Sequence, residues 1–225
     1  TRTVDVPASE HGLPLARARN AGAEAALAEG ASTLVFLDVD CIPGRELLAR
    51  YRAAARVEPE ALLCGPVAYL PPAGEEGYDL AALEVHARPH AARPDPVPGT
   101  LVRDDAGHTL FWSLSFAATA GTWTRLGGFD EAYEGYGGED TDFAQRARDA
   151  GVPVVWVGGA HAFHQHHPVS DPPVEHLDDI VRNATLFHER WGWWPMAGWL
   201  EAFEEAGLVE RSDGTWRRTS PERRD

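Results

Sequence analysis

Residues 34–43 constrain the fold of this chain more than any other segment, because an apolar strand there runs directly into two carboxylates. Leu34-Val-Phe-Leu37 has the apolar character of a strand in a sheet, and Asp38 and Asp40 follow it at once. Open α/β sheets bind their ligands at the carboxyl ends of their strands. On an extended backbone these two side chains leave the same face, so we expect Asp38 and Asp40 to lie side by side.

Two adjacent carboxylates indicate a cation site. They repel each other unless a cation or a hydrogen-bond donor compensates their charge. Hard oxygen ligands of this kind suit Mg²⁺ or Mn²⁺ that bridges to substrate phosphates. The alternative is a solvated turn after the strand, since Asp, Pro and Gly are common turn residues. The Asp-x-Asp spacing alone does not decide between the two interpretations.

Length and composition limit the classes of protein to which the chain can belong. With 225 residues, 44% of them hydrophobic, the chain is long enough for one domain with a full core. Its formal net charge of −15 at pH 7 disfavours a nucleic-acid partner. Two cysteines are too few for a disulfide framework, so we expect a reduced, cytoplasmic protein. No apolar run approaches the ~20 residues of a membrane span, and the oligomeric state stays open.

Strand-like and helix-like segments alternate along the chain, which is typical of an α/β sheet flanked by helices. Residues 88–107 are rich in Pro, Asp and Gly, and we expect a long mobile loop there. The expected strands are residues 4–6, 34–37, 61–69, 111–120 and 152–157, and the expected helices are residues 15–29, 44–57, 79–86, 139–150, 174–190 and 195–206.

A glycine-rich acidic motif occupies residues 127–142, Gly-Gly-Phe-Asp-Glu-Ala-Tyr-Glu-Gly-Tyr-Gly-Gly-Glu-Asp-Thr-Asp. Its glycines allow sharp turns and a close approach of the backbone to a ligand. Glu139, Asp140 and Asp142 follow at the start of a predicted helix, where the helix dipole favours acidic groups. The dipole accounts for Asp142 as a structural group, but it does not require the glycine-rich turn. The motif therefore predicts a general base, which must be a carboxylate within reach of a substrate.

A histidine motif, His-Ala-Phe-His-Gln-His-His at residues 161–167, follows the predicted strand 152–157. Imidazole ligates transition metals, including Mn²⁺ when carboxylates share the site. Alternation along an extended backbone places His164 and His166 on one face, with His161 and His167 on the other. A solvated histidine run on the surface is the alternative.

A fourth motif, Arg17-Ala-Arg-Asn20, lies at the start of the first predicted helix. An arginine beside a helix N-terminus can hold a diphosphate. An exposed helix arginine is the favoured interpretation for Arg17, and Arg19 is the better candidate for binding.

In their order along the chain, the four motifs resemble those of the inverting GT-A glycosyltransferases, namely the family-two enzymes and their galactosyltransferase relatives. Gly-Gly-Phe-Asp-Glu followed by Gly-Gly-Glu-Asp is the specific part of the resemblance. It implies a GT-A-like (Rossmann-like) mixed sheet over residues 1–170, with residues 171–225 as a helical extension packed on the same domain. The matching segments, within residues 13–168, are Ala18-Arg-Asn-Ala-Gly22, Phe36-Leu-Asp-Val-Asp40, Gly127-Gly-Phe-Asp-Glu131, Gly137-Gly-Glu-Asp140 and His161 to His167.

The resemblance also implies a role for each matching residue. Asp140 would be the catalytic base, and Glu139 would hold the hydroxyls of the acceptor. Asp40 and His164 would ligate Mn²⁺ or Mg²⁺, with His161 as a further candidate ligand. The other implied roles are contacts to the nucleotide, by Arg19, Asn20 and Asp38, and contacts to the donor sugar or acceptor, by Gly127, Gly128, Tyr136 and Gly138.

The activity implied by the resemblance is the transfer of a hexose from a nucleotide sugar, expected to be UDP-linked, to an acceptor hydroxyl. A single metal-dependent displacement would invert the anomeric configuration. One alternative is a non-catalytic GT-A-like module that binds a sugar or a partner. Another is a metal-dependent phosphoesterase, which would leave the Gly-Gly-Glu-Asp turn without a role.

The chain departs from the family pattern in two places. Two further strand–helix units normally precede the aspartate strand and hold the nucleotide base, whereas only about 33 residues precede it here. We therefore expect either a fragment or a pared-down variant. Tyr136 stands where relatives often have Trp in the glycine-rich turn, which leaves the acceptor open.

Overall fold

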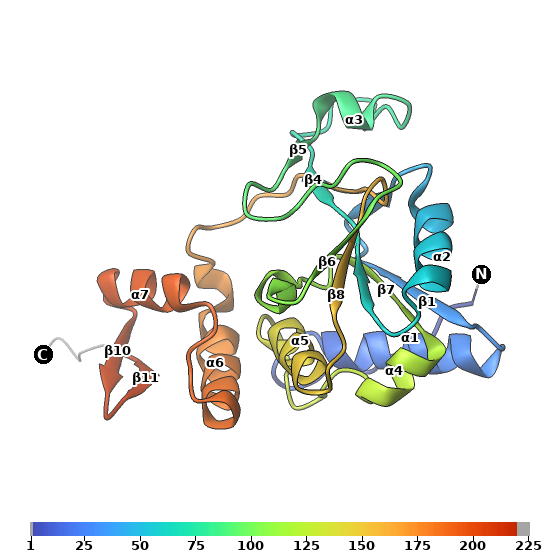
Figure 1. Ribbon diagram of the computed structural model, residues 1–225. Helices are drawn as coiled ribbons and strands as arrows, with labels where there is room; N and C mark the ends of the chain where they lie inside the picture. Colours follow the sequence, from blue (N-terminus) through green and yellow to red (C-terminus); the bar gives the residue numbers. More distant parts are fainter. Residues whose placement is uncertain (1, 220–225) are drawn as a thin grey trace, which may run out of the picture. The chain divides into compact units, whose positions relative to one another are not determined.

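A five-stranded mixed sheet organises the larger part of the chain in this computed structural model, which describes residues 2–219 (Figure 1). Strands β3 and β8 pair in parallel, and the other neighbours pair antiparallel. The apolar, fully buried β3 and β8 have the composition of strands covered on both faces. The predicted mixed α/β sheet is confirmed. In spatial order the strands are β1 (Thr33–Leu37), β7 (Ser115–Thr119), β3 (Leu62–Cys64), β8 (Val154–Val157) and β6 (Leu101–Asp104).

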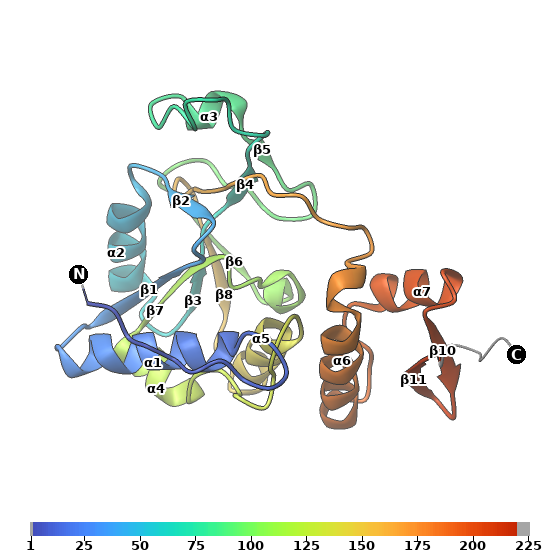
Figure 2. The ribbon, with the colours of Figure 1, turned by 180° about the vertical axis from the view of Figure 1, so that it is seen from behind.

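Side chains that alternate along these strands give the sheet two apolar faces, each covered by a helix. Ala117 belongs to the face that packs against α2 (Leu47–Val57), where Tyr51 is fully buried. On the other face Phe36 and Phe116 stack with ring centroids 4.4 Å apart. Phe36 also stacks on Trp123 of α4 (Ala120–Leu126). Figure 2 shows α2 and α4 beside the strands from behind.

A second sheet of four strands continues from the ends of the first, in the order β2 (Cys41–Pro43), β9 (Ala162–His164), β4 (Val67–Tyr69) and β5 (Arg88–Pro89). The register of central strand β9 sets both Cys41 and Tyr69 opposite His164. The single strand predicted over residues 61–69 is wrong, because β3 and β4 lie in different sheets. A Cβ on Gly65, between them, would lie 2.1 Å from the carbonyl oxygen of Ala160, so this crossing requires glycine.

The chain forms two compact units. The sheet unit consists of residues 22–128 and 143–167, and it includes α3 (Leu83–His86) and the 3₁₀ helix η1 (Gly107–Leu110). The tail unit consists, among the described residues, of 2–21, 129–142 and 168–219. Helices α1 (Leu15–Ala28) and α5 (Glu139–Asp149) each have residues in both units.

The tail unit has its own core, in which Ile180, Phe203 and Trp216 pack together. Residues 171–225 are not only helical as predicted, because β10 and β11 form an antiparallel hairpin near the end of the described chain. Its elements after residue 168 are η2 (Val174–His176), α6 (Leu177–Trp191), α7 (Ala197–Glu205), β10 (Val209–Ser212) and β11 (Thr215–Arg218).

Two further local predictions are wrong. Residues 4–6 form no strand, since they pair with no other segment and Val4 is exposed. Residues 88–107 are not a continuous loop, because they contain β5 and also β6, which pairs with β8 from Leu101↔Val157 to Asp104↔Val154. The predicted helix at 79–86 is shortened to α3, whereas α1, α2 and α5 begin and end within three residues of their predicted bounds.

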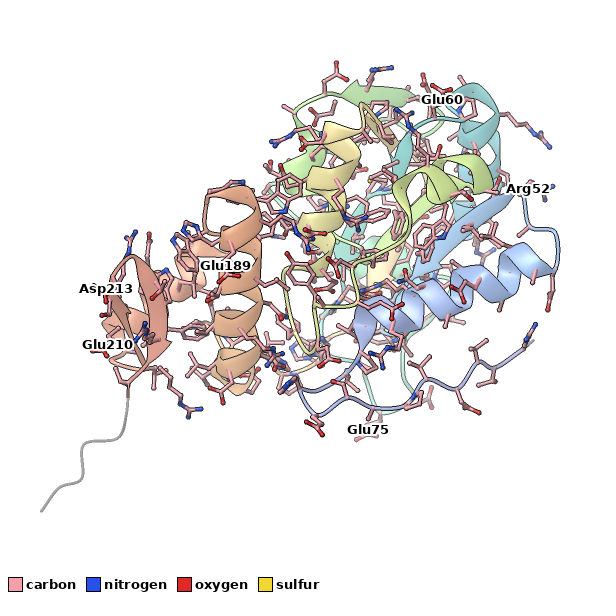
Figure 3. The ribbon with its side chains drawn as sticks, turned by 90° about the horizontal axis from the view of Figure 1, so that it is seen from below. Arg52, Glu60, Glu75, Glu189, Glu210 and Asp213 are labelled. Carbon is pink, nitrogen blue, oxygen red and sulfur yellow. The ribbon has the colours of Figure 1, made fainter. Side chains whose placement is uncertain are left out.

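Several acidic side chains of each unit are exposed, because an ionised carboxylate is stabilised by water. Figure 3 labels four of them, Glu60 and Glu75 of the sheet unit and Glu189 and Glu210 of the tail unit. No helix within residues 2–219 is both long and apolar enough to cross a bilayer.

Candidate functional site

Asp38 and Asp40 lie at the turn between the two sheets of the sheet unit. Strand β1 ends at Leu37, and the Cys41 amide donates to the Asp38 carbonyl at 2.9 Å across the turn. Val39 at its tip is 99% exposed. The extended backbone predicted through Asp38 and Asp40 is therefore wrong. Asp38 stays next to the first sheet, where its amide donates to the Leu114 carbonyl at 3.0 Å.

Asp40 lies against two histidines of the third motif. Its Oδ2 is 3.4 Å from Nε2 of His164 and 3.6 Å from Nε2 of His167. One ligand atom from each of the three residues lies within 4.8 Å of the others. The Gln165 amide donates to the Asp40 carbonyl at 2.8 Å, which fixes the turn against the end of β9. The structure thus brings Asp40 and His164 together, and it adds His167.

The three side chains, which we call the metal triad, fit a divalent ion. Oδ1 of Asp40 is buried and accepts no hydrogen bond from any residue in the described part of the chain. A buried carboxylate oxygen without a partner is costly, and a cation would compensate it. One carboxylate and two imidazoles suit Mn²⁺ or another transition ion better than Mg²⁺.

The Cys41 thiol, next to Asp40 in the chain, stays protonated. Burial, and then the charges of Asp40 and Asp38, raise its pKa.

His161 lies apart from the metal triad. Its Nε2 is 3.0 Å from Oδ1 of Asp95, and both residues line a cavity of about 250 Å³. The predicted separation of His164 from His167 on opposite faces is wrong, because both imidazoles lie beside Asp40 and β9 ends at His164. Alternation could therefore not identify His167 as the second histidine.

In the tail unit, residues 129–142, which we call the acidic loop, are held by one face of α6. Nδ2 of Asn183 donates to the carbonyls of Glu134 at 2.9 Å, Tyr136 at 3.2 Å and Gly137 at 2.8 Å. A Cβ on Gly135, which has φ +70°, would lie 2.1 Å from a carboxylate oxygen of Asp179. The glycines therefore allow the loop to close on α6. Sequence reasoning missed this support, although polar residues recur at helical spacing on α6, at Asp179, Arg182, Asn183 and Arg190.

Asp142 anchors the same loop. Its carboxylate is fully buried and accepts from Arg190 Nη1 at 2.6 Å, Trp191 Nε1 at 2.9 Å and the Tyr133 hydroxyl at 3.3 Å. Burial and the Asp142 charge raise the pKa of Tyr133, which therefore remains a donor. Arg190 also donates to Asp130 at 2.5 Å. These contacts agree with the structural role predicted for Asp142.

Glu139 and Asp140 open α5 at the end of the acidic loop. Glu139 is 6% exposed, and its Oε1 accepts from Arg19 Nη1 at 3.2 Å, while Oε2 is buried without a partner among residues 2–219. Burial, and next the charge of Asp140, raise the pKa of Glu139 to about 7, although Arg19 opposes the shift. Asp140 is half-buried, and its Oδ1 accepts from the Thr141 amide at 2.7 Å.

Asn20, a predicted nucleotide contact, is bound to the acidic loop. Its Oδ1 accepts from the Phe129 amide at 2.8 Å, and its Nδ2 donates to the Phe129 carbonyl and to Glu131, each at 2.9 Å. The structure therefore uses the amide of Asn20 to hold the first residues of the loop. Arg19 lies over the same segment, 5.4 Å from the centroid of the Phe129 ring.

The remaining predicted residues serve turns and ring contacts. Gly127 caps α4 with φ +73°, and the carbonyl of Gly128 accepts from Arg146 at 2.6 Å. In the tail unit Tyr136 is exposed and stacks on His176, with ring centroids 4.4 Å apart. A Cβ on Gly138, which has φ +92°, would lie 3.2 Å from the Tyr133 ring.

Comparisons with known proteins match parts of this chain. Residues 107–168 match a family model described as the N-terminal domain of galactosyltransferase. Validoxylamine A glucosyltransferase from Streptomyces hygroscopicus subsp. jinggangensis (strain 5008) is 40% identical over 45 residues, which are 20% of this chain and 11% of that protein. The enzyme from subsp. limoneus is also 40% identical over 45 residues, which are 20% of this chain and 10% of that protein. The matched part thus spans about a tenth of these relatives.

A solved structure shares the fold. The crystal structure of GalNAc-T7 with UDP, GalNAc and Mn²⁺ superposes with a TM-score of 0.50 at 17% sequence identity. The superposition covers 71% of this chain and 31% of GalNAc-T7.

Proposed function

We propose that this chain transfers a hexose from a UDP-sugar to an acceptor hydroxyl with inversion of the anomeric configuration. Its fold and sequence matches support a GT-A-like glycosyltransferase. The proposal includes dependence on a divalent ion. The single observation that carries it is the metal triad with the unpartnered, buried Oδ1 of Asp40. GalNAc-T7, which shares the fold, was crystallised with UDP and Mn²⁺.

Asp40, His164 and His167 would hold the ion. When bound there, Mn²⁺ or Mg²⁺ would neutralise charge on the departing diphosphate. His161 is a weaker candidate than His167 because its imidazole is paired with Asp95. In this proposal Asp38, one turn residue away from Asp40, contacts the ribose or the waters of the ion.

Asp140 is the proposed general base. Its carboxylate would take the proton of the acceptor hydroxyl, and the oxygen would then form a bond to the anomeric carbon as the bond from that carbon to the diphosphate breaks. The bonding electron pair would leave with the diphosphate, so one displacement inverts the configuration. Below pH 7 Glu139 retains a proton, which leaves Asp140 without a like charge beside it. Neutral Glu139 can also donate a hydrogen bond to an acceptor hydroxyl.

The other predicted residues receive supporting roles. Arg19 would lie near the nucleotide while it neutralises Glu139, and Asn20 would hold the start of the acidic loop. Tyr136, exposed and stacked on His176, offers a ring on which a sugar can pack. The turns at Gly127, Gly128 and Gly138 would shape the pockets for the donor sugar and the acceptor.

The test is a transfer assay with a panel of nucleotide sugars and acceptors in the presence of Mn²⁺, with the anomeric configuration of the product read by NMR. We expect Asp140→Asn to lower kcat by about 10²- to 10⁴-fold, while calorimetry shows unchanged UDP binding. Asp149→Asn, an exposed position on the same helix, is the control and should retain activity.

Three outcomes would contradict the proposal. Equal loss of transfer and UDP binding in Asp140→Asn would make that residue structural. UDP binding without a product from any donor and acceptor would favour a non-catalytic module. Release of phosphate from simple esters would favour the phosphoesterase.

A further inference from the structure

Arg93 in the sheet unit lies over two tryptophan rings. Its Cζ lies 5.2 Å from the ring centroid of Trp112 and 5.1 Å from that of Trp156, and the residue is only 6% exposed. It belongs to the segment between β5 and β6, where its amide donates to the His90 carbonyl at 3.1 Å. Both indole rings attract the guanidinium charge, which is a favourable cation–π arrangement.

The edge of this guanidinium is not satisfied. Nε, Nη1 and Nη2 of Arg93 are all buried, and none donates a hydrogen bond to any residue among those described. The aromatic rings attract the charge of Arg93, but they do not replace hydrogen-bond acceptors for its N–H groups. These donors are therefore left without acceptors. Buried charges in proteins are normally paired, because an unpaired one is costly. An anion at the edge of the guanidinium would remove this cost.

A continuous row of rings connects Arg93 to the metal triad. Tyr69 lies 5.0 Å from His164 and 6.0 Å from His90, and His90 lies 4.7 Å from Trp112, between ring centroids. The guanidinium and the triad are thus two ends of one aromatic cluster within the sheet unit. Burial raises the pKa of Tyr69, the Arg93 charge opposes this shift, and the Asp40 charge adds to it. Both charges therefore act on the same phenol.

We infer that Arg93 binds phosphate: its guanidinium edge receives oxygens of the donor's diphosphate, next to the ion that the metal triad would hold. This inference rests on the proposed function. The planar fork of arginine matches phosphate oxygens with two parallel hydrogen bonds. In a chain with net charge −15, a diphosphate also needs local positive charge. Residues 90–100, which include Arg93, contain no helix or strand, so admitting an anion at the guanidinium breaks no sheet pairing.

The test measures binding of inorganic pyrophosphate by calorimetry, with EDTA and then with Mg²⁺, so that no sugar transfer is needed. We expect Arg93→Gln to bind pyrophosphate about 10- to 100-fold more weakly than the unchanged protein. Arg93→Lys, which keeps the charge but loses the fork, should be about tenfold weaker. Arg103→Gln is the matched control, since Arg103 is exposed on β6 and paired with Asp105, and it should bind normally.

Hydrogen exchange of the unchanged protein gives an independent readout, since pyrophosphate should protect residues 90–100. Circular dichroism shows whether Arg93→Gln is folded. If it is not, the pyrophosphate affinity of Arg93→Lys and the hydrogen-exchange experiment test the inference. The inference would be overturned if the unchanged protein, Arg93→Gln and Arg93→Lys bound pyrophosphate with equal affinity, and Arg93 would then be a structural cation. It would also be overturned if the unchanged protein did not bind pyrophosphate.

The two proposals fail separately. Binding of pyrophosphate that depends on Arg93, in a protein that turns over no nucleotide sugar, would reject the proposed function and retain the anion site. Sugar transfer by a protein whose pyrophosphate affinity is insensitive to Arg93 would reject the anion site alone.

Discussion

Asp142 in the tail unit is fully buried and Asp40 in the sheet unit is half-buried, and the two differ in how fully their carboxylate oxygens are hydrogen-bonded. Asp142 accepts from the side chains of Tyr133, Arg190 and Trp191, the last two of which lie on α6. In Asp40, Oδ2 lies 3.4 Å and 3.6 Å from the imidazoles of His164 and His167. Its Oδ1 has no hydrogen-bond partner among the described residues. A satisfied buried charge holds a loop in place, whereas an unsatisfied one indicates that a ligand completes it. The same residue type therefore serves structure in one unit and the proposed binding in the other.

Removal of the satisfied carboxylate should have the largest effect. Asp142→Ala leaves Arg190 and the Trp191 indole N–H without their buried acceptor, so we expect a loss of about 3–5 kcal/mol in the free energy of unfolding. Urea unfolding followed by tryptophan fluorescence measures it. Asp149→Ala, at an exposed ion pair with Arg148, should cost less than about 1 kcal/mol. Similar midpoints for the two variants would remove the contrast between the aspartates.

Substitution of Asp40, the unsatisfied carboxylate, should change metal binding and leave the stability of the metal-free protein nearly unchanged. Without metal, we expect Asp40→Asn to change the free energy of unfolding by less than about 1 kcal/mol, since residues at binding sites contribute little to stability. With Mn²⁺ at about 100 times its Kd, the unchanged protein should gain about 2.7 kcal/mol. Asp40→Asn should lose this gain. Thermal unfolding with and without Mn²⁺ checks both statements, and a metal-free loss as large as that of Asp142→Ala would show that Asp40 is structural.

The sequence predicted the mixed sheet and its main helices because those segments carry a clear periodicity. Apolar strands such as Val154–Val157 and the helices α1, α2 and α5 appear near their predicted bounds. The fold is GT-A-like, as the motifs implied, and GalNAc-T7 shares it. The second sheet was not predicted, because strands of two or three residues are too short to show alternation and are defined by their register with β9.

The candidate site was predicted in its residue types but not in its contacts. Asp40 and His164 lie together, yet His167 joins them only because the chain leaves the sheet after β9, which alternation does not anticipate. Asn183 and Arg93 escaped notice for another reason. Asn183 lies in a helix for which the sequence predicted only the bounds, and Arg93 lies in a segment predicted to be a mobile loop.

Glu139 should make stability fall as the pH rises. Its folded-state pKa of about 7 lies above its ordinary value of 4.5, because burial and Asp140 disfavour the charge. The folded protein therefore binds more protons than the unfolded chain between these values, and stability is lost as the pH rises through this window. Glu139→Gln removes the titration, so we expect it to be more stable than the unchanged protein by about 1–3 kcal/mol at pH 8 and similar at pH 4.

Urea unfolding across pH 4–8 measures the Glu139 effect. Glu24→Gln, at an exposed position of α1, is the control and should leave the pH profile unchanged. A Glu139→Gln profile parallel to that of the unchanged protein would show that Glu139 does not titrate in this range. It would also remove the argument that a neutral Glu139 leaves Asp140 without a like charge beside it.

The smallest expected effect separates the histidines within the sheet unit. His167→Ala removes one of the two imidazoles at Asp40, so we expect the affinity for Mn²⁺ to fall about tenfold, a loss of about 1.4 kcal/mol. His161→Ala should leave the affinity unchanged, because that imidazole is paired with Asp95 and lines a cavity to which no residue of the metal triad contributes. Titration of Mn²⁺ followed by electron paramagnetic resonance gives both constants. If His161→Ala weakened binding while His167→Ala did not, the metal triad would be misassigned, and the contrast between Asp40 and Asp142 would have to rest on Oδ1 of Asp40 alone.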